Sequence, residues 1–457
     1  MPGILPPVNT LPVEIFTHIF EILEEDFRGK KLEGGLPPSF VCSGVCFLWR
    51  HIIIETPSLW THINIKIGQK NYNSASLSLI RSKNLPIYLR ISEPKLVPSP
   101  TSEELLNLLI EAWSRLHSLD IDSRVRSEQL VYDILSCWLD YGEIGMTTAL
   151  RVQRPSISLF DQPLPSGWRL SSRHSAAYSE SVLQSVSVLH LKDIIPPWAS
   201  TAYHDLVDLR LTFTYASYKA KIEVTRLADV FIASPALSTF KLSGLCLTSR
   251  DGITERQIIS LNYLKTFYLS DMNQESLRLI LSILSFSGCS DGLSIGLHDV
   301  WDGDDGTLLD FLLRTPVRVL ACTPSRRCSP FRLLSLVKKV LPSLDTLVLV
   351  GTGALDRREY RGLARAFTTS EEDSSIRHLY IASGETNLID LKHVIPAFGV
   401  RVLHLDGCAI SDILDHNSPS NSYELTTGLL DTLLNITCIV SDIDTTNDWP
   451  CRKMFDN

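Results

Sequence analysis

A segment late in the chain has the spacing of a nucleotide-binding turn. Gly351-Thr352-Gly353 follows the apolar run 344–350, an expected strand, and precedes a stretch with helical periodicity. In the dinucleotide-binding fingerprint a third glycine lets the helix pack closely on the strand, and the pyrophosphate lies at the helix N-terminus. Here Asp356 takes the place of that glycine, and its negative charge would oppose a pyrophosphate. We interpret the segment as a turn within a repeat and keep a nucleotide-dependent enzyme as an alternative.

A second segment, "DVWDGDDGTLLD", gathers carboxylates of the kind that bind calcium. Its acids stand at positions 299, 302, 304, 305 and 310. When Gly306 is aligned with the glycine that an EF-hand loop requires, Trp301 and Gly303 fall where ligands belong. This spacing argues against calcium binding. We expect a solvated acidic loop in which Trp301 could anchor a partner.

The cysteine and histidine positions form no catalytic or metal-binding pattern. Cys42 and Cys46 are four residues apart with no second ligand pair nearby, and no CxxC, HExxH or GxxxxGK[ST] motif occurs. We therefore predict no catalytic residue, no metal, no cofactor and no enzymatic activity. Three of the twelve histidines, His190, His378 and His404, stand at x positions of an L-x-x-L-x-L segment. Such positions are expected to point away from the apolar core, toward a surface that could bind a partner.

The composition limits the class of protein. With 457 residues the chain exceeds the roughly 250–300 at which a single core stops growing, so several domains or a repeat architecture are expected. The net charge of −8 argues against general binding to nucleic-acid phosphates, which needs clustered Lys and Arg. No apolar run of about 18 residues is present, so no membrane association is expected. Without a secretory signal, the ten scattered cysteines are expected to be reduced, in the cytoplasm or the nucleus.

The first seventy residues contain two short apolar helices. In "NTLPVEIFTHIFEIL", Pro12 suits the first helical position and Glu14 the first turn, ahead of apolar residues spaced by three and four. A loop with Gly34-Gly35 and Pro37-Pro38 follows. Beyond it a second helix over 41–53 is expected to carry one apolar face made of Val41, Val45, Trp49 and Ile53. Two helices of this size cannot bury all their apolar surface against each other, so a partner or a neighbouring domain is needed.

Three segments of this region, in order, resemble the F-box family. They are "LPVEIFTHIF", "SGVCFLWRHI" and "TPSLW", which are similar to the LPxEI opening, the V-C-x-x-W-R centre and the P-x-L-W close of the fungal-type motif. The resemblance implies an F-box adaptor-binding domain over 1–67 that docks on the Skp-type adaptor, and through it the cullin, of an SCF-type ubiquitin ligase. The residues that it would bring to this interface are Leu11, Pro12, Ile15, Ile19, Phe20, Val45, Cys46, Trp49, Leu59 and Trp60. The alternative is that they are core residues of a small helical subdomain.

Behind this region an apolar L-x-x-L-x-L pattern recurs. It is present in segments that begin at Leu116, Val186, Leu206, Leu237, Leu264, Val317, Leu344, Ile376 and Val400. Successive steps from Leu206 are 31 and 27 residues, and those from Val317 are 27, 32 and 24, with 293–297 as a degenerate copy between the two series. Such periods indicate leucine-rich repeats, in which each strand and helix is covered only by stacking of the next unit. The alternative is an ordinary α/β domain with buried parallel strands.

We therefore predict an α/β protein: a short N-terminal helical F-box, an irregular leucine-rich-repeat-like solenoid over 68–440, and a polar tail over 441–457. The stretch 141–175 is expected to hold one poorly matching unit with a long insert. In this interpretation the chain is the substrate-recognition subunit of the ligase. The repeats bind a protein target whose identity the sequence does not give, and a separate enzyme transfers ubiquitin. A repeat scaffold that is not coupled to ubiquitination is the alternative.

Overall fold

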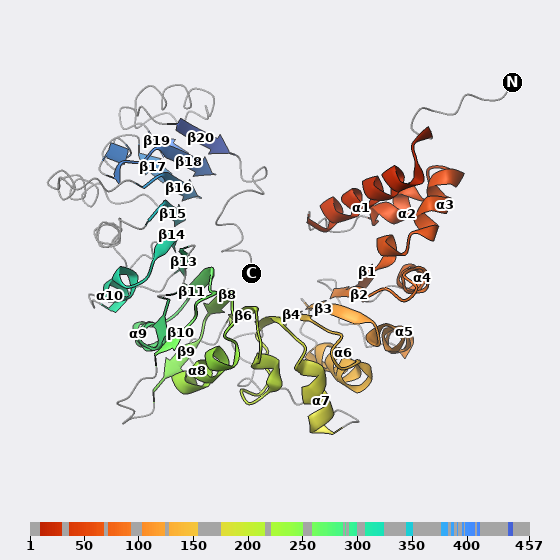
Figure 1. The fold of residues 1–457 in the computed structure, drawn as a ribbon, viewed down its shortest axis with the longest axis horizontal. Coiled ribbons are helices and arrows are strands. Elements are labelled where there is room, and N and C mark those ends of the chain that lie inside the picture. The colour runs from red at the N-terminus through yellow and green to blue at the C-terminus, as the bar shows by residue number, and fades with distance from the viewer. Residues whose placement is uncertain are drawn as a thin grey trace. The chain divides into compact units, whose positions relative to one another are not determined.

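The computed structural model describes residues 10–29, 36–67, 72–92, 103–123, 128–153, 175–214, 221–249, 258–286, 288, 292–298, 307–323, 344–350, 376–382, 385–387, 391, 395–396, 398–406, 409–411 and 437–441. It divides into two compact units, Met1–His204 and Asp205–Asn457, which are described separately. Both contain short parallel strands joined by helices or loops (Figure 1), so the fold is mixed α/β, as predicted.

The first unit begins with three helices and continues with alternating strands and helices. Its helices are α1 (Val13–Gly29), α2 (Pro38–Cys42), α3 (Phe47–Glu55), α4 (Asn73–Arg81), α5 (Glu103–Trp113), α6 (Glu128–Tyr141) and α7 (Ala176–Leu183), with 3₁₀ turns η2 (Pro57–Trp60) and η3 (Thr201–Tyr203). Its strands are β1 (His62–Lys66), β2 (Ile87–Ser92), β3 (Leu116–Asp122), β4 (Ala149–Gln153) and β5 (Val188–Lys192). Each strand pairs in parallel with the next.

Helix α1 begins where the sequence predicts. The backbone N–H of Ile15 donates to the carbonyl of Pro12 at 3.1 Å, and Glu14 occupies the first turn. A carboxylate in this turn is favoured by the helix dipole. Phe16 and Phe20, one turn apart, are buried. The predicted apolar periodicity therefore places one side of α1 in a core.

The prediction of a single second helix over 41–53 is wrong, because two shorter helices, α2 and α3, stand in its place. Between them Cys46 has an extended backbone (φ −153°, ψ 171°), which interrupts the helical hydrogen-bond series. Gly44 lies in the intervening turn, and glycine is a poorer helix former than Ala by about 1 kcal/mol. Val45 lies in the same turn, so it does not share a helix face with Trp49.

Alternate residues of the strands in the first unit are buried on the side where the helices pack. In register across β3, β4 and β5 are Leu119, Leu150 and Leu189, and two residues later Ile121, Val152 and Leu191. The residues between them point to the opposite side of the sheet, which we call the open face. Figure 1 shows α4 to α6 along one side of these strands. This unit therefore has the strand–helix repeats of a leucine-rich-repeat-like region.

The second unit continues the same pattern with more strands. Its main sheet has the order β6 (Asp208–Thr212), β8 (Thr239–Ser243), β11 (Thr266–Ser270), β13 (Leu293–His298), β14 (Val317–Thr323), β15 (Thr346–Val350), β16 (His378–Ala382), β18 (Val402–Asp406) and β20 (Thr437–Ser441). Three small parallel pairs accompany it: β7 (Lys221–Glu223) with β9 (Cys246–Thr248), β10 (Ile259–Ser260) with β12 (Leu284–Ser285), and β17 (Glu385–Asn387) with β19 (Ala409–Ser411). The described helices are α8 (Val224–Ala233), α9 (Gln274–Ile283) and α10 (Thr307–Leu313).

One apolar position runs through the main sheet of the second unit in register. Its members are Leu209, Phe240, Phe267, Ile295, Leu320, Leu347, Leu379, Leu403 and Cys438. Phe240 and Phe267 stack with ring centroids 5.9 Å apart, and Phe231 from α8 meets Phe240 edge-on at 5.0 Å. Every L-x-x-L-x-L segment predicted in this unit forms a strand of the sheet. The predicted repeat pattern is therefore confirmed in the described residues.

The stretch 141–175, expected to hold one poorly matching unit, contains strand β4. Thr147 occupies the first apolar position of this unit, three residues before Leu150, so the leucine pattern is incomplete there. Its hydroxyl is buried, donates to the carbonyl of Leu116 at 3.0 Å and accepts from the indole of Trp138 at 3.2 Å. A polar side chain is tolerated at this core position because both hydrogen bonds are made inside the protein.

Arginine side chains cap helices of preceding repeats. Arg115, just before β3, donates to the carbonyls of Leu79 (at 3.2 Å) and Lys83 at the end of α4. Arg314, before β14, donates to the carbonyl of Leu281 in α9 at 2.5 Å. The last carbonyls of a helix lack helical partners, and a cation there also complements the helix dipole. These contacts join two of the repeats to the helices that precede them.

Several segments singled out in the sequence lie outside the described residues. They are the nucleotide-like turn at Gly351 and Gly353, the acidic loop 299–306 with Trp301, and the polar tail beyond residue 441. What the sequence predicts for them stays a prediction. No helix among the residues that the structure describes has the length and apolar character needed to span a membrane.

Candidate functional site

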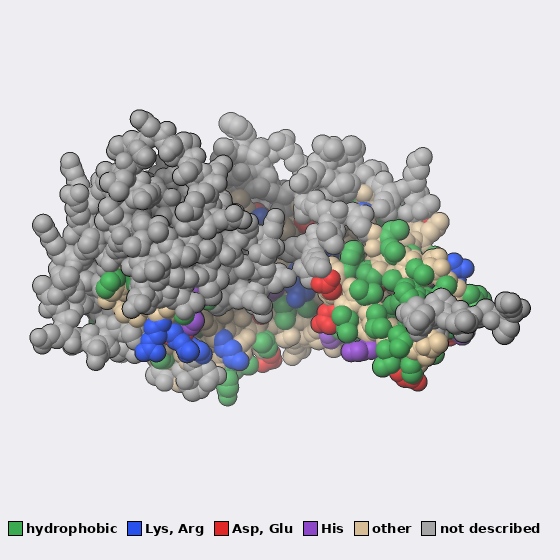
Figure 2. All heavy atoms as spheres, turned by 90° about the horizontal axis from the view of Figure 1, so that it is seen from above, with side chains coloured by type: hydrophobic (Ala, Val, Ile, Leu, Met, Phe, Trp, Pro, Cys, Tyr) green, Lys and Arg blue, Asp and Glu red, His purple; other side chains and the backbone are tan. Residues whose placement is uncertain are grey.

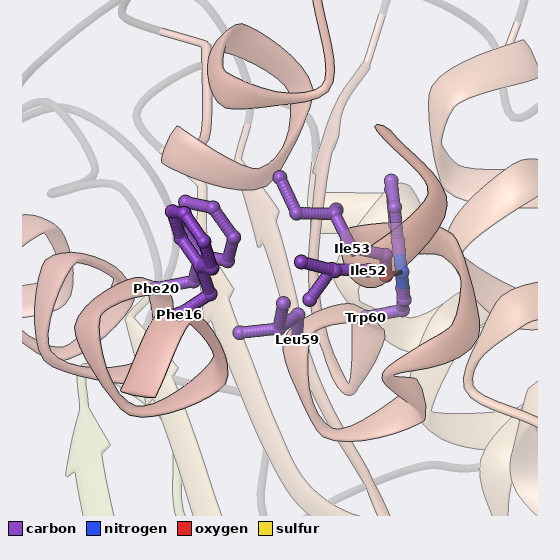
Figure 3. Packing of buried hydrophobic residues seen from close by; sticks show 6 residues of the cluster. All are labelled: Phe16, Phe20, Ile52, Ile53, Leu59 and Trp60. Carbon is purple, nitrogen blue, oxygen red and sulfur yellow. Dashed lines mark hydrogen bonds between the residues drawn. The ribbon is translucent and has the colours of Figure 1, made fainter. Parts of the chain in front are cut away.

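Helices α1 to α3 and the turn η2 form a core of their own. Figure 3 shows its buried side chains converging from α1, α3 and η2: Phe16, Phe20, Ile52, Ile53, Leu59 and Trp60. The partly buried side chains of Phe40, Leu48 and Trp49 pack against this cluster. The inner side of α1 is therefore covered by neighbouring residues of this chain.

Trp49 links α3 to α1. Its ring meets Phe16 edge-on with centroids 5.8 Å apart and Phe20 at 5.4 Å. Such aromatic pairs contribute roughly 0.5–1.5 kcal/mol beyond their buried area. The indole N–H of Trp49 is buried, and among the described residues it meets no hydrogen-bond acceptor. An unsatisfied buried donor costs about 1–3 kcal/mol, which offsets part of the aromatic stabilisation.

Trp60 joins the N-terminal helices to the first repeat. Its indole Nε1 donates to the carbonyl of Ile53 at 2.8 Å, and its ring meets Phe40 edge-on at 5.1 Å. On another side the guanidinium of Arg81, at the end of α4, lies 4.4 Å from the ring centroid. Cation–π contacts of this kind are worth roughly 0.5–2 kcal/mol. Trp60 thus holds helices α2 and α3 against α4.

A buried carboxylate fixes the start of α2. Glu24 of α1 accepts a hydrogen bond from the backbone N–H of Ser39 at 2.7 Å, and both residues are buried. The first N–H groups of a helix have no helical partner, so this carboxylate satisfies one and also complements the helix dipole. Burial, and secondly the charge of Glu24, raises the pKa of the nearby Cys42 thiol. Cys42 is therefore a poor candidate for a reactive or metal-binding thiolate.

The turn between α2 and α3 is held by polar contacts. The Sγ of Cys46 accepts from the backbone N–H of Trp49 at 3.5 Å and so caps α3. The Nε of Arg50 donates to the carbonyl of Ser43 at 2.9 Å. These bonds tie both ends of the turn to α3, so its apolar side chains project from a well-defined backbone.

The outer side of the same helices is apolar and exposed. On α1 and just before it, the exposed large apolar side chains are Leu11, Val13, Ile15, Ile19, Ile22 and Leu23. On α2, α3 and the adjoining turns they are Leu36, Val41, Val45 and Phe47. Figure 2 shows hydrophobic side chains gathered over this part of the chain, on the right of the view. We call these residues the docking surface, because exposed apolar patches on soluble proteins mark interaction sites.

The ten residues that the F-box resemblance assigns to adaptor binding fall into three groups. The exposed ones are Leu11, Pro12, Ile15, Ile19 and Val45. The half-buried ones are Cys46 and Trp49. The buried ones are Phe20, Leu59 and Trp60. The structure places the first group on elements that pack against one another and leaves the third group in the core that supports them.

The structure adds residues that the sequence analysis did not assign to this surface. Phe47, at the start of α3, is 83% exposed, and its ring lies parallel to that of His51 with centroids 6.4 Å apart. Val41 was expected to share one apolar helix face with Trp49 and Ile53; it is exposed, whereas Ile53 is buried. The sequence did contain a signal that Phe47 and Trp49 face different sides. Phe47 precedes Trp49 by two residues, which places the two side chains about 200° apart around a helix.

No protein-family model matches this chain. No curated protein matches it either. Among solved structures, the chain is similar to the crystal structure of an internalin, inlF, from Listeria monocytogenes, at 11% sequence identity and a TM-score of 0.31. That match covers 81% of this chain and 89% of the internalin chain. The F-box resemblance therefore rests on the three sequence segments quoted above.

The histidines placed at x positions lie on open faces, as expected. His190 is on β5 between two buried leucines, and His378 and His404 are on β16 and β18. The ring of His404 stacks on Tyr380 with centroids 3.9 Å apart, and its Nε2 lies 3.4 Å from Nδ1 of His378. Burial, and secondly His378, lowers the pKa of His404 to about 4, so this ring is neutral near pH 7.

One catalytic-type motif was overlooked in the sequence. Gly292, Ser294 and Gly296 have the G-x-S-x-G spacing, in which hydrolases carry a serine nucleophile on a sharp strand-to-helix turn. Here Ser294 lies inside strand β13, paired with Thr266 of β11, and not on such a turn. Among the described residues, no group of three or more His, Cys, Asp or Glu is placed to hold a metal ion.

Proposed function

We propose that this chain is the substrate-recognition subunit of a cullin–RING (SCF-type) ubiquitin ligase. Its N-terminal helices would dock on the Skp-type adaptor, and its leucine-rich-repeat-like region would bind a protein target. The observation that carries the proposal is a helical subdomain with its own buried core and an exposed apolar outer side.

The docking surface supports a protein partner on energetic grounds. Ile15 is 47% exposed and Val45 is 60% exposed, although both are large aliphatic residues. Fully burying one such side chain is worth roughly 1.5–3 kcal/mol, so a partner that covers several of them gains substantial affinity. The F-box motifs direct the choice of partner, because exposed residues of the docking surface stand at motif positions.

The proposed mechanism is proximity. The adaptor-bound chain would hold its target near a ubiquitin-transferring enzyme that the cullin carries, which raises the effective concentration of target lysines. In this mechanism no residue of the chain performs chemistry, and no metal or cofactor is needed. We propose that it works in the cytoplasm or nucleus, without nucleic acid or membrane.

A repeat scaffold without a ligase is the second candidate. The observation in its favour is the leucine-rich-repeat-like sheet, which offers a surface for protein binding whatever the N-terminal helices do. The scaffold needs no adaptor, so adaptor binding separates the two functions.

Capture of a purified Skp-type adaptor by the full chain tests the proposal. Wild type is expected to retain the adaptor, whereas Ile15→Glu is expected to lose it, because a buried carboxylate at the interface would be unpaired. Ile232→Glu on α8 is the matched control, since Ile232 is 49% exposed but belongs to the second unit.

Two outcomes would contradict the proposal. The first is a folded wild-type chain that captures no adaptor, and the second is a capture that Ile15→Glu leaves unchanged. If the chain binds other proteins but captures no adaptor, the scaffold function is favoured.

A further inference from the structure

The open faces of the strands in the two units differ in accessibility. In the first unit Asn64 and Tyr88 are exposed, and Arg90 and Arg151 are half-buried. In the second unit the residues at the central open-face position are buried over a long stretch: Lys241, Tyr268, Gly296, Ala321, Val348 and Tyr380. Three of these, Ala321, Val348 and Tyr380, form an apolar cluster. A partner therefore has freer access to the open face of β1 to β5.

A preformed group of rings stands on this accessible face. His62 of β1 and Tyr88 of β2 are stacked, with centroids 4.3 Å apart and planes 3° apart. Tyr88 also meets His117 of β3 edge-on at 5.2 Å. These contacts hold Tyr88 in one orientation while 37% of it stays exposed. Rigid tyrosines are over-represented among the residues that dominate binding energy at interfaces.

Basic side chains outnumber acidic ones on the same face. The basic residues are Lys66, Arg90, Arg151 and Lys192, and the acidic residues are Asp120 and Asp122. Arg90 offsets charge on both aspartates, at 3.7 Å from Asp120 and 3.5 Å from Asp122.

The remaining cations lack acidic partners within this part of the structure. Arg151 donates to the hydroxyl of Ser118 at 3.3 Å. No carboxylate of the described residues lies within the 4.0 Å ion-pair distance of Arg151, Lys66 or Lys192. Although the whole chain has a net charge of −8, Arg151, Lys66 and Lys192 thus carry positive charge on this face without an ion-pair partner among the described residues.

We propose that the open face of β1 to β5 binds an acidic segment of a protein partner. Arg151 and Lys192, on the adjacent strands β4 and β5, pair with carboxylates of that segment. Tyr88 contacts one of its apolar or aromatic side chains. The inference rests on the proposed function in one respect: it takes the acidic partner to be the target of the ligase. The positive charge and the stacked rings of this face do not depend on adaptor binding.

The strand spacing sets the length of the segment. Neighbouring strands lie about 4.8 Å apart, so β5 lies roughly 14 Å across the sheet from β2. Lys192 also lies four residues, about 13 Å, further along β5 than Val188, the residue in register with Tyr88, so the two residues are roughly 20 Å apart. Arg151 is nearer to Tyr88, at roughly 12 Å. An extended chain advances about 3.5 Å per residue, so the expected target has acidic residues about three to six positions from a large apolar residue.

Binding of a labelled deca-glutamate peptide to the full chain at low salt tests the proposal. Wild type is expected to bind this probe, and Arg151→Glu or Lys192→Glu is expected to weaken binding about tenfold or more. Arg151→Lys is expected to retain most of the affinity, because it keeps the charge. Arg226→Glu makes the same charge change at an exposed position of α8, a helix of the second unit, and is expected to have little effect.

Four results would overturn the proposal: no binding of deca-glutamate by wild type, equal weakening by Arg226→Glu, unchanged binding by both open-face variants, or tighter Arg151-dependent binding of an oligothymidine. The last would make nucleic acid the occupant of this face. Adaptor capture measured on the same proteins keeps the two proposals apart. A wild-type chain that binds the peptide but not the adaptor contradicts the ligase function and leaves the acidic-segment site intact.

Discussion

Ile15 and Phe16 are consecutive residues of α1 that face opposite environments: Ile15 is 47% exposed and Phe16 is 1% exposed. Each residue advances about 100° around a helix, which carries one side chain outward and the next toward Phe20 and Trp49. The proposed adaptor contact and the packing of the core therefore involve neighbouring positions of one helical turn, and substitutions can separate the two.

Replacing Phe16 by Ala is expected to destabilise the N-terminal helices by about 3–5 kcal/mol, because a buried aromatic ring is lost and a cavity remains. Replacing Ile15 by Ala is expected to change stability by no more than about 0.5 kcal/mol. Urea denaturation of both variants, followed by circular dichroism, checks this. Equal stability losses at the two positions would show that α1 is not packed as described.

Replacing Phe47 by Ala is expected to weaken adaptor binding about tenfold or more, equivalent to about 1.4 kcal/mol, without lowering the melting temperature. The reason is that the ring is almost wholly solvent-exposed in the free chain and gains burial only from a partner. Titration calorimetry with the adaptor measures the effect. Tyr263→Ala is the matched control, since Tyr263 is 68% exposed in the second unit. An adaptor affinity that is unchanged in Phe47→Ala would remove this residue from the interface.

Replacing Glu24 by Ala is expected to cost about 1–3 kcal/mol of stability, because the buried N–H of Ser39 loses its acceptor. Glu25→Ala provides the control, as Glu25 follows in the same helix and is exposed. Hydrogen exchange at the start of α2 should accelerate in the first variant and not in the second. Unchanged protection of Ser39 in Glu24→Ala would contradict the capping role.

Acidification is expected to destabilise the fold between about pH 6.5 and pH 4. Burial, and secondly Arg28, lowers the pKa of His62 to about 4, and burial with His378 does the same for His404. The unfolded chain, with histidine pKa values near 6.5, binds more protons in this interval, so stability is present above it and falls as the pH falls.

Melting temperatures measured across this pH interval test the expectation. His62→Gln and His404→Gln should each reduce the slope of melting temperature against pH. His18→Gln, at an exposed position of α1, is the comparison. A slope that is the same in all four proteins would show that neither ring titrates in a buried setting.

Local patterns in the sequence were sufficient for the start of α1 and for most of the repeat strands. Pro12 and Glu14 place the start of α1 because the first turn has its own steric and electrostatic preferences. The spacing of Leu209 and Leu211 predicts a strand because alternate side chains must reach the same buried side. Such signals are carried by residues close together in the chain.

Signals that depend on distant residues were missed or misassigned. Thr147 takes a leucine position because Leu116 and Trp138, far away in sequence, satisfy its hydroxyl. The helix break at Cys46 follows from capping contacts that a periodicity of four cannot reveal. Ser294 matches a hydrolase motif by spacing, and its place inside a strand removes that interpretation.

The sequence alone determined the apolar character of the N-terminal helices and the recurrence of strands behind them, because both are properties of short periodic segments. Only the tertiary structure decided which apolar residues are covered. Whether Ile15 is exposed and Trp60 is buried depends on which other elements pack against each residue. Arg81 from the first repeat, for example, packs on the ring of Trp60. The division into a supporting core and an exposed apolar surface is therefore a property of the fold.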